Sequence, residues 1–223
     1  MFPLELRKQR AAARPKFSLN LTPAICRRKI HRVLPMICTT TPERVAAIWT
    51  LLRTPELPDL EQGPRSGVLP CRQLEVRLRG LCAELMLGTE TTDRVVSAGL
   101  LYHDHHNEAH DLVEDMTDAE GAVIHAIVHR REPDFWNARY WYRRVGDHPI
   151  YRSMTGRVVE LAGTDATSSV ARRLVLSGTL DPLAFVDACE SVVRKGAADP
   201  VAQFLRRLQH AEFEALLDHL VVG

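Results

Sequence analysis

Apolar residues recur every three or four positions along most of the chain after residue 40, the spacing that gives a helix one apolar face. Leu74, Leu78, Leu81 and Leu85 show the pattern clearly, and Gly88 follows them as a helix stop. No segment alternates apolar and polar residues over more than a few positions, as a half-buried strand would. The pattern therefore predicts an all-α fold of about nine helices. The clearest of them span roughly 41–54, 71–87, 117–132, 135–145 and 200–220.

Capping residues and helix breakers mark the ends of these segments. Thr117 and Glu120 have the spacing of a capping box, and Asp134 is placed to cap the helix that follows Pro133. Four prolines and two glycines stand between residues 54 and 70, and they predict one long loop because they support neither helix nor strand. Pairs of a capping residue and a proline predict three further helix starts, at Thr41-Pro42, Asp181-Pro182 and Asp199-Pro200.

The composition is that of an ordinary globular protein, since 45% of the 223 residues are hydrophobic and 26% are charged. We therefore expect residues 36–223 to form one domain, a compact bundle or an irregular array built from helical hairpins. No apolar run approaches the roughly 20 residues needed to span a bilayer. The five cysteines are odd in number and include no Cys-x-x-Cys pair, which argues against a disulfide framework or a zinc finger and favours the cytoplasm.

Charge is distributed unevenly along the chain. Nine Lys or Arg residues and one acid, Glu5, precede Met36, so residues 1–35 carry a net charge of +8 and the remaining chain carries −7. The segment has no clear helical period, and we predict a flexible extension, with a nucleic-acid-binding arm or a transit peptide as the alternatives. Because the body of the chain is acidic, nucleic-acid binding outside residues 1–35 is not expected.

Histidines are concentrated in the middle of the chain, where six of the ten fall within 27 residues. His125 and His129 stand four residues apart on a predicted helix, which places them about 40° from one another around its axis. Glu132, three residues further on, would share that flank if the helix continues to it. Imidazole and carboxylate ligands suit zinc or iron and would leave positions open for water and substrate. The spacing therefore predicts a divalent metal site.

The preceding segment is predicted to form a hairpin of two helices on either side of a break at residues 103–107. A further ligand could come from His110 in this hairpin, or from His103, Asp104 or His106. In the simplest chemistry, metal-assisted hydrolysis or hydration, the ion lowers the pKa of bound water, and Glu132 or Asp104 takes the proton. The alternative is a structural role, because histidines four residues apart occur by chance on many helices and the His-Glu-x-x-His order of zinc proteases is absent. The expected metal ligands are His110, His125 and His129.

An arginine- and aromatic-rich segment, residues 130–148, overlaps the end of this motif. Guanidinium groups offer a planar fork for carboxylate or phosphate, and aromatic rings offer stacking faces. We therefore predict that a small anionic molecule binds there, with Arg130 or Arg144 neutralising the charge on a substrate. The alternative is a polar network with the acids Glu114, Asp115, Glu132 and Asp134. The candidate ligand-binding residues are Arg130, Arg131, Asn137, Trp141, Arg143, Arg144 and His148.

Motifs of several large enzyme classes are absent from the sequence. There is no Gly-x-Ser-x-Gly, no glycine-rich phosphate loop and no Gly-x-Gly-x-x-Gly, which argues against the common hydrolase, kinase and dinucleotide-binding folds. The functional hypothesis is therefore a central polar pocket, rich in His, Arg and Glu, that binds a divalent metal or a small anion. The alternative is a non-catalytic module whose helical hairpins bind another protein.

Local segments resemble known sequences. Residues 97–116 resemble a tetratricopeptide helix–turn–helix, and residues 138–149 are similar to part of a Sel1-type repeat, although no repeat of about 34 residues is present. The run HAIVHRREPDFWNARYWYRRVGDHP, residues 125–149, with flanking segments between about 70 and 220, resembles an uncharacterised bacterial family of helical proteins. That resemblance implies a helical fold and draws attention to the His, Arg and Glu positions named above, but it implies no reaction.

Overall fold

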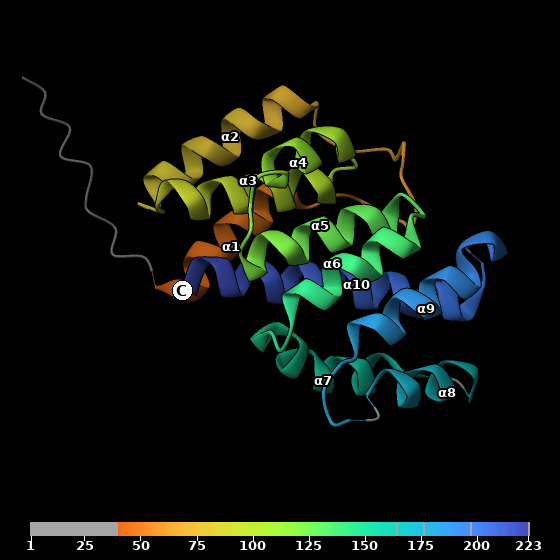
Figure 1. Cartoon of the computed structure of the whole chain (residues 1–223). Helices are drawn as coiled ribbons and strands as arrows, with labels where there is room; N and C mark the ends of the chain where they lie inside the picture. The colour runs from red at the N-terminus through yellow and green to blue at the C-terminus, as the bar shows by residue number, and fades with distance from the viewer. Residues whose placement is uncertain (1–39, 164, 176, 197, 223) are drawn as a thin grey trace, which may run out of the picture. The chain divides into compact units, whose positions relative to one another are not determined.

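The computed structural model describes residues 40–163, 165–175, 177–196 and 198–222. Within these ranges the chain forms ten α-helices and one short 3-10 helix without a β-strand, which confirms the predicted all-α class (Figure 1). The elements are α1 (Thr41–Leu52), α2 (Cys71–Glu84), α3 (Thr89–Tyr102), α4 (His106–Val113), α5 (Ala119–Arg131), α6 (Phe135–Val145), α7 (Pro149–Leu161), α8 (Asp165–Leu174), α9 (Pro182–Val192), η1 (Val193–Lys195) and α10 (Pro200–Val222).

Local capping explains where several helices begin. α1 follows Thr40, whose backbone N–H donates to Glu43 Oε2 at 2.8 Å in a capping box, so the cap is Thr40 and not the predicted Thr41. α5 is capped by Asp118, the residue after the predicted Thr117, because the Asp118 carboxylate accepts a backbone hydrogen bond from the first turn. The predicted caps Asp134, Asp181 and Asp199 are confirmed, because each carboxylate accepts a hydrogen bond from a backbone N–H at the start of its helix.

Two helices, α5 and α10, form the centre of the structure. α5 is buried around its whole circumference, since every residue from 121 to 131 is buried. α10 contacts α1, α3, α7, α8 and α9 along its 23 residues. Because most of the other helices pack against one of these two, the polar side chains of α5 must find their partners inside the protein.

The functional candidates lie where α4 and α6 pack against α5. α3 and α4 form the predicted helical hairpin, which places α4 beside α5 (Figure 1). α6 follows α5 after a short corner at residues 132–134 and packs closely against it. Side chains from three helices can therefore meet at this junction.

The predicted loop over residues 54–70 contains no regular helix or strand, as its prolines require. It is nevertheless held against the core: the Arg131 guanidinium donates to the carbonyls of Asp59 at 3.1 Å and Glu61 at 3.3 Å. Gln209 on α10 also donates to the Asp59 carbonyl, at 2.9 Å. The loop is therefore anchored by polar side chains of the two central helices.

Two further predictions concern membrane-spanning helices and the N-terminal extension. None of the described helices combines the length and the apolar character that crossing a membrane requires. The predicted extension, residues 1–35, lies outside the described residues.

Candidate metal centre

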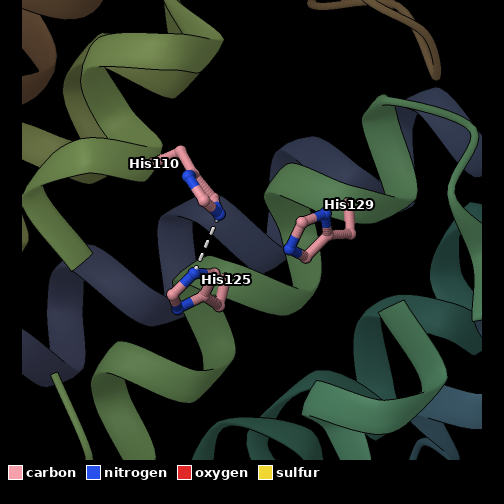
Figure 2. Close-up of side chains that lie close together, drawn as sticks. All are labelled: His110, His125 and His129. Carbon is pink, nitrogen blue, oxygen red and sulfur yellow. Dashed lines mark hydrogen bonds between the residues drawn. The ribbon is translucent and has the colours of Figure 1, made fainter. Parts of the chain in front are cut away.

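Three histidines from two helices converge at the junction of α4 and α5 (Figure 2). They are the three expected metal ligands, His110 on α4 and His125 and His129 on α5. One ring nitrogen from each lies within 4.8 Å of the others, and Nε2 of His110 is 3.1 Å from Nε2 of His125. The sequence prediction that these three imidazoles share one cluster is therefore confirmed, whereas metal binding itself stays a prediction.

The helical geometry of α5 sets the orientation of two rings. His125 and His129 are one turn apart, and their rings are nearly parallel, with centroids 5.7 Å apart and planes 12° apart. His110 meets both rings edge-on, with centroid distances of 4.7 Å to His125 and 5.2 Å to His129. The packing of α4 against α5 thus supplies the third imidazole that α5 alone cannot provide.

His129 is held by hydrogen bonds on both sides of its ring. Its Nδ1 lies 3.0 Å from Glu132 Oε2, and its Nε2 lies 3.1 Å from the amide nitrogen of Asn137 on α6. A carboxylate can only accept, so Nδ1 carries the hydrogen and Nε2 presents a lone pair. The hydrogen bond from His129 lowers the pKa of Glu132. A histidine oriented by a carboxylate in this way is the usual arrangement of an imidazole that ligates a metal.

Glu132 occupies a different position from the one that helical periodicity suggests. α5 ends at Arg131, and Glu132 is its C-terminal cap, because Pro133 follows. The side chain still turns back to His129, so it contacts the cluster through that ring. Its structural place is that of a residue that orients His129, and its predicted role as a proton acceptor stays a prediction.

His125 is the most buried of the three imidazoles, with 2% of its surface exposed. Its ring stacks on the indole of Trp141 from α6, with a centroid distance of 4.0 Å and planes 2° apart. Burial, and then the neighbouring His110 and His129, lower the pKa of His125 to about 4. The ring is therefore neutral at neutral pH, and one of its nitrogens has a lone pair available for a cation.

The cluster lies just beneath the protein surface. His129 is 8% exposed and His110 is half-buried. Trp141 is also half-buried, and the exposed Arg144 lies over its ring, with its guanidinium carbon 5.3 Å from the ring centroid. Of the predicted anion-binding residues, Asn137 and Trp141 contact the histidine cluster, and Arg144 contacts the Trp141 ring. Arg143 is exposed on the same helix.

Arg130 points into the core between α5 and α10. Its side chain is fully buried, and it donates to Glu212 Oε2 at 2.5 Å, to Gln209 Oε1 at 3.3 Å and to the Tyr142 hydroxyl at 2.6 Å. Both Nη atoms of Arg130 thus have protein partners, and a substrate contact by Arg130 stays a prediction. The acid that pairs with Arg130 is Glu212, whereas the sequence suggested acids close to Arg130 in the chain. The sequence signal for Glu212 is a charged residue inside the apolar stripe of α10.

Arg131 and Asp104 belong to a second buried network. Arg131 Nη2 lies 2.6 Å from Asp104 Oδ1, and Arg65 from the 54–70 loop lies 3.1 Å from Asp104 Oδ2. Both carboxylate oxygens of Asp104 are thus paired with guanidinium groups. These contacts give both residues a part in holding the loop to the core, and their predicted roles in catalysis or ligand binding stay predictions.

The remaining histidine candidates are dispersed. His103 is buried between the Leu69 N–H, 3.0 Å from its Nδ1, and the Leu52 carbonyl, 3.1 Å from its Nε2. His106 is buried with its Nδ1 3.1 Å from the Asp104 carbonyl. Of the predicted alternatives for a further ligand, His110 therefore lies in the cluster with His125 and His129, whereas His103 and His106 do not.

His148 caps α7, which begins at Pro149 because proline is favoured at the first helical position. Its Nδ1 accepts from the Ile150 N–H at 3.4 Å. Its Nε2 faces Glu120 at 3.8 Å, and its ring lies 4.8 Å from that of His219. His148 therefore belongs to a separate polar cluster, and its predicted ligand contact stays a prediction.

Comparisons with known proteins leave the geometry as the only basis for a functional proposal. No protein-family model matches the chain, and the searches of curated proteins and of solved structures found no match. The resemblances to tetratricopeptide and Sel1 segments, and to the bacterial helical family, therefore stay predictions.

Proposed function

We propose that this chain is a metal-binding protein in which His110, His125 and His129 hold a divalent zinc or iron ion. The observation that carries the proposal is the convergence of three imidazoles from two helices, each offering a ring nitrogen within 4.8 Å of the other two. A fully buried structural histidine needs only its own hydrogen-bond partners, and it does not require two further imidazoles beside it.

The distances support this donor set. Two nitrogens that each lie about 2.0–2.1 Å from a tetrahedral zinc ion are about 3.3 Å apart, and Nε2 of His110 is 3.1 Å from Nε2 of His125. Glu132 orients His129 so that its Nε2 has a lone pair, which is the form that binds a metal. Neutral imidazole is a common ligand of both zinc and iron.

Three protein ligands would leave a coordination position open, which is the arrangement of catalytic and not of closed structural zinc sites. An ion held this way lowers the pKa of a bound water and supports hydrolysis or hydration. Arg144 and Trp141 stand at the exposed edge of the cluster and could receive a small anionic substrate. A cytoplasmic, metal-assisted hydrolase is therefore the activity that we propose for this site.

Metal content is the direct test of the proposed centre. We expect purified protein to retain about one equivalent of zinc or iron at this site by elemental analysis, and His125→Ala and His129→Ala to lose it. His210→Gln is the matched control, because His210 is half-buried on α10 and contacts Tyr102 and Trp49 instead of the cluster. Retention of the full metal content of the original protein in both alanine variants would overturn the proposal.

The alternative is a non-catalytic interaction module in which the three histidines only pack and hydrogen-bond. A groove of about 620 Å³ with largely apolar walls, including Val45, Trp49 and Met154, is the feature that favours it. Metal-free protein, together with unchanged folding of His125→Ala and His129→Ala, would support this alternative over the metal centre.

A further inference from the structure

A second set of potential metal ligands lies at the opposite side of α4, where α2 begins. Cys71 is the first residue of α2, His105 caps α4 and Glu108 stands in the first turn of α4. One ligand atom from each of these residues lies within 4.8 Å of the others. We propose that Cys71, His105 and Glu108 form a second divalent metal site, one with a thiolate ligand suited to zinc.

Hydrogen bonding fixes the histidine in the form that this site needs. His105 Nε2 lies 2.8 Å from the Leu69 carbonyl oxygen, which can only accept, so Nε2 carries the hydrogen. The other nitrogen, Nδ1, then has the free lone pair. An imidazole that donates one N–H to a backbone carbonyl and offers the other nitrogen is the common form of a metal-binding histidine.

The same backbone segment positions the cysteine. Leu69 stands two residues before Cys71, and its N–H donates to His103 Nδ1 at 3.0 Å while its carbonyl accepts from His105. Histidines of the α3–α4 turn therefore hydrogen-bond both the N–H and the carbonyl of Leu69, which holds the chain in place just before Cys71. Ligands held by such contacts need little reorganisation when an ion binds.

The charges of the three side chains suit a divalent cation. A divalent cation would bind the Cys71 sulfur as the thiolate and release the thiol proton to solvent. One thiolate and one carboxylate would then balance the two charges of the ion, and His105 would add a neutral ligand.

Solvent can reach this site. A cavity of about 510 Å³ is lined by Cys71 and Glu108 together with Arg72, Glu75 and Arg79. The Arg79 guanidinium is paired with Glu75 at 2.8 Å and with Asp93 at 2.7 Å, so its charge is compensated by these acids. A cation can therefore enter from this side, and water can complete its coordination.

The two proposed centres are independent because they occupy different faces of α4. Glu108 and His110 are two residues apart, which separates them by about 200° around the helix axis. His110 faces α5, whereas Glu108 shares its cavity with residues of α2. Loss of one metal site should therefore leave the other in place.

Cobalt(II) titration of the full chain under reducing conditions tests the second site, because only a thiolate ligand gives the intense near-ultraviolet sulfur-to-cobalt absorption. The parent is Cys26→Ser/Cys38→Ser, which removes the two cysteines outside the described residues. We expect this absorption to saturate within two equivalents in the parent, when both proposed centres are filled, and to vanish in Cys71→Ser. Glu108→Gln, at an exposed position, should weaken the affinity for cobalt at least about tenfold. Loss of a residue that only hydrogen-bonds a metal ligand already lowers metal affinity about 10–100-fold.

His125→Ala serves as the control that separates the two centres. His125→Ala should keep the thiolate absorption but lose the equivalent of cobalt that the three histidines bind. Cys71→Ser should lose the thiolate absorption but keep the equivalent of cobalt that the three histidines bind. Circular dichroism of the metal-free variants confirms that each remains folded. The second site is overturned if the folded parent gives no thiolate absorption with cobalt, or if the absorption persists in Cys71→Ser.

Discussion

Arg130 Nη2 and Glu212 Oε2 lie 2.5 Å apart, and both side chains are fully buried. The Tyr142 hydroxyl links the two partners, since it accepts from Arg130 at 2.6 Å and donates to Glu212 Oε1 at 2.9 Å. The three residues belong to α5, α6 and α10, so the network joins these helices at a point one residue from His129. The buried ion pair therefore joins α5, which carries His125 and His129, to α6 and α10.

Removal of one partner of this ion pair should be costly. Glu212→Ala leaves the Arg130 charge buried without its counter-charge, and we expect the free energy of unfolding to fall by about 3–5 kcal/mol. Urea unfolding followed by circular dichroism measures the change. The double variant Arg130→Met/Glu212→Leu should be more stable than either single variant, because it removes both charges and keeps the apolar volume. A loss below about 1 kcal/mol in Glu212→Ala would contradict the inferred role of the pair.

The fold class and part of the site were predictable because their geometry is local. Helical periodicity and capping pairs fixed most helix positions, and two histidines one turn apart share a helix flank wherever that helix packs. His110 joined them because short connections place consecutive helices side by side. The capping errors at Thr41 and Thr117 were of one residue, since adjacent Thr and Asp residues compete for the same backbone N–H groups.

Long-range pairings could not be predicted from local pattern. Arg130 and Glu212 are 82 residues apart, and Arg131 reaches the Asp59 carbonyl 72 residues away, so the sequence suggested nearby acids as partners instead. The Cys71 cluster was missed for a related reason. Its proposed ligands come from the starts of two helices with the whole of α3 between them in the chain, so the spacing of the cysteines gives no sign of the cluster.

Protonation of His148 should make the fold less stable in mild acid. Burial, and then the nearby His219, lower the pKa of His148, although Glu120 on α5 opposes the shift. A lowered pKa means that the unfolded chain binds the proton more readily, so the stabilising contribution is complete above the ordinary histidine pKa of about 6.5 and is lost as the pH falls through the lower pKa of the folded state.

The variant His148→Asn isolates this effect, because asparagine can still cap α7 but does not titrate. We expect the free energy of unfolding to drop between pH 7 and pH 5 by less in this variant than in the original protein. Urea unfolding at both pH values, with a chelator present to exclude metal effects, gives the comparison. An equal drop in the two proteins would show that His148 keeps its ordinary pKa.

Loss of the carboxylate behind His129 should weaken the proposed metal centre without removing a ligand. In Glu132→Gln the side chain keeps its size, but the amide holds the His129 N–H less strongly than a carboxylate does. We expect zinc affinity to fall about 10–100-fold, as is typical for the outer partner of a metal-binding histidine. Competition with a chromophoric chelator measures the affinity, and Glu114→Gln, at an exposed position on the end of α4, is the control. Equal affinities in all three proteins would exclude the orienting role.

Arg144 should carry the selectivity of the site for anions. Its guanidinium lies over Trp141, which in turn stacks on His125, so a chain of stacked groups connects the exposed face of α6 to the histidine cluster. Inorganic phosphate should raise the Tm of the metal-loaded protein, and Arg144→Ala should lose most of that shift, since one charge-assisted hydrogen bond contributes about 1.5–3 kcal/mol, roughly a tenfold or greater change in affinity. Arg152→Ala is the matched control, because Arg152 is exposed on α7 and pairs with Asp147. A phosphate shift of the same size in both variants would mean that phosphate acts through ionic strength, and the anion-binding role of Arg144 would then be rejected.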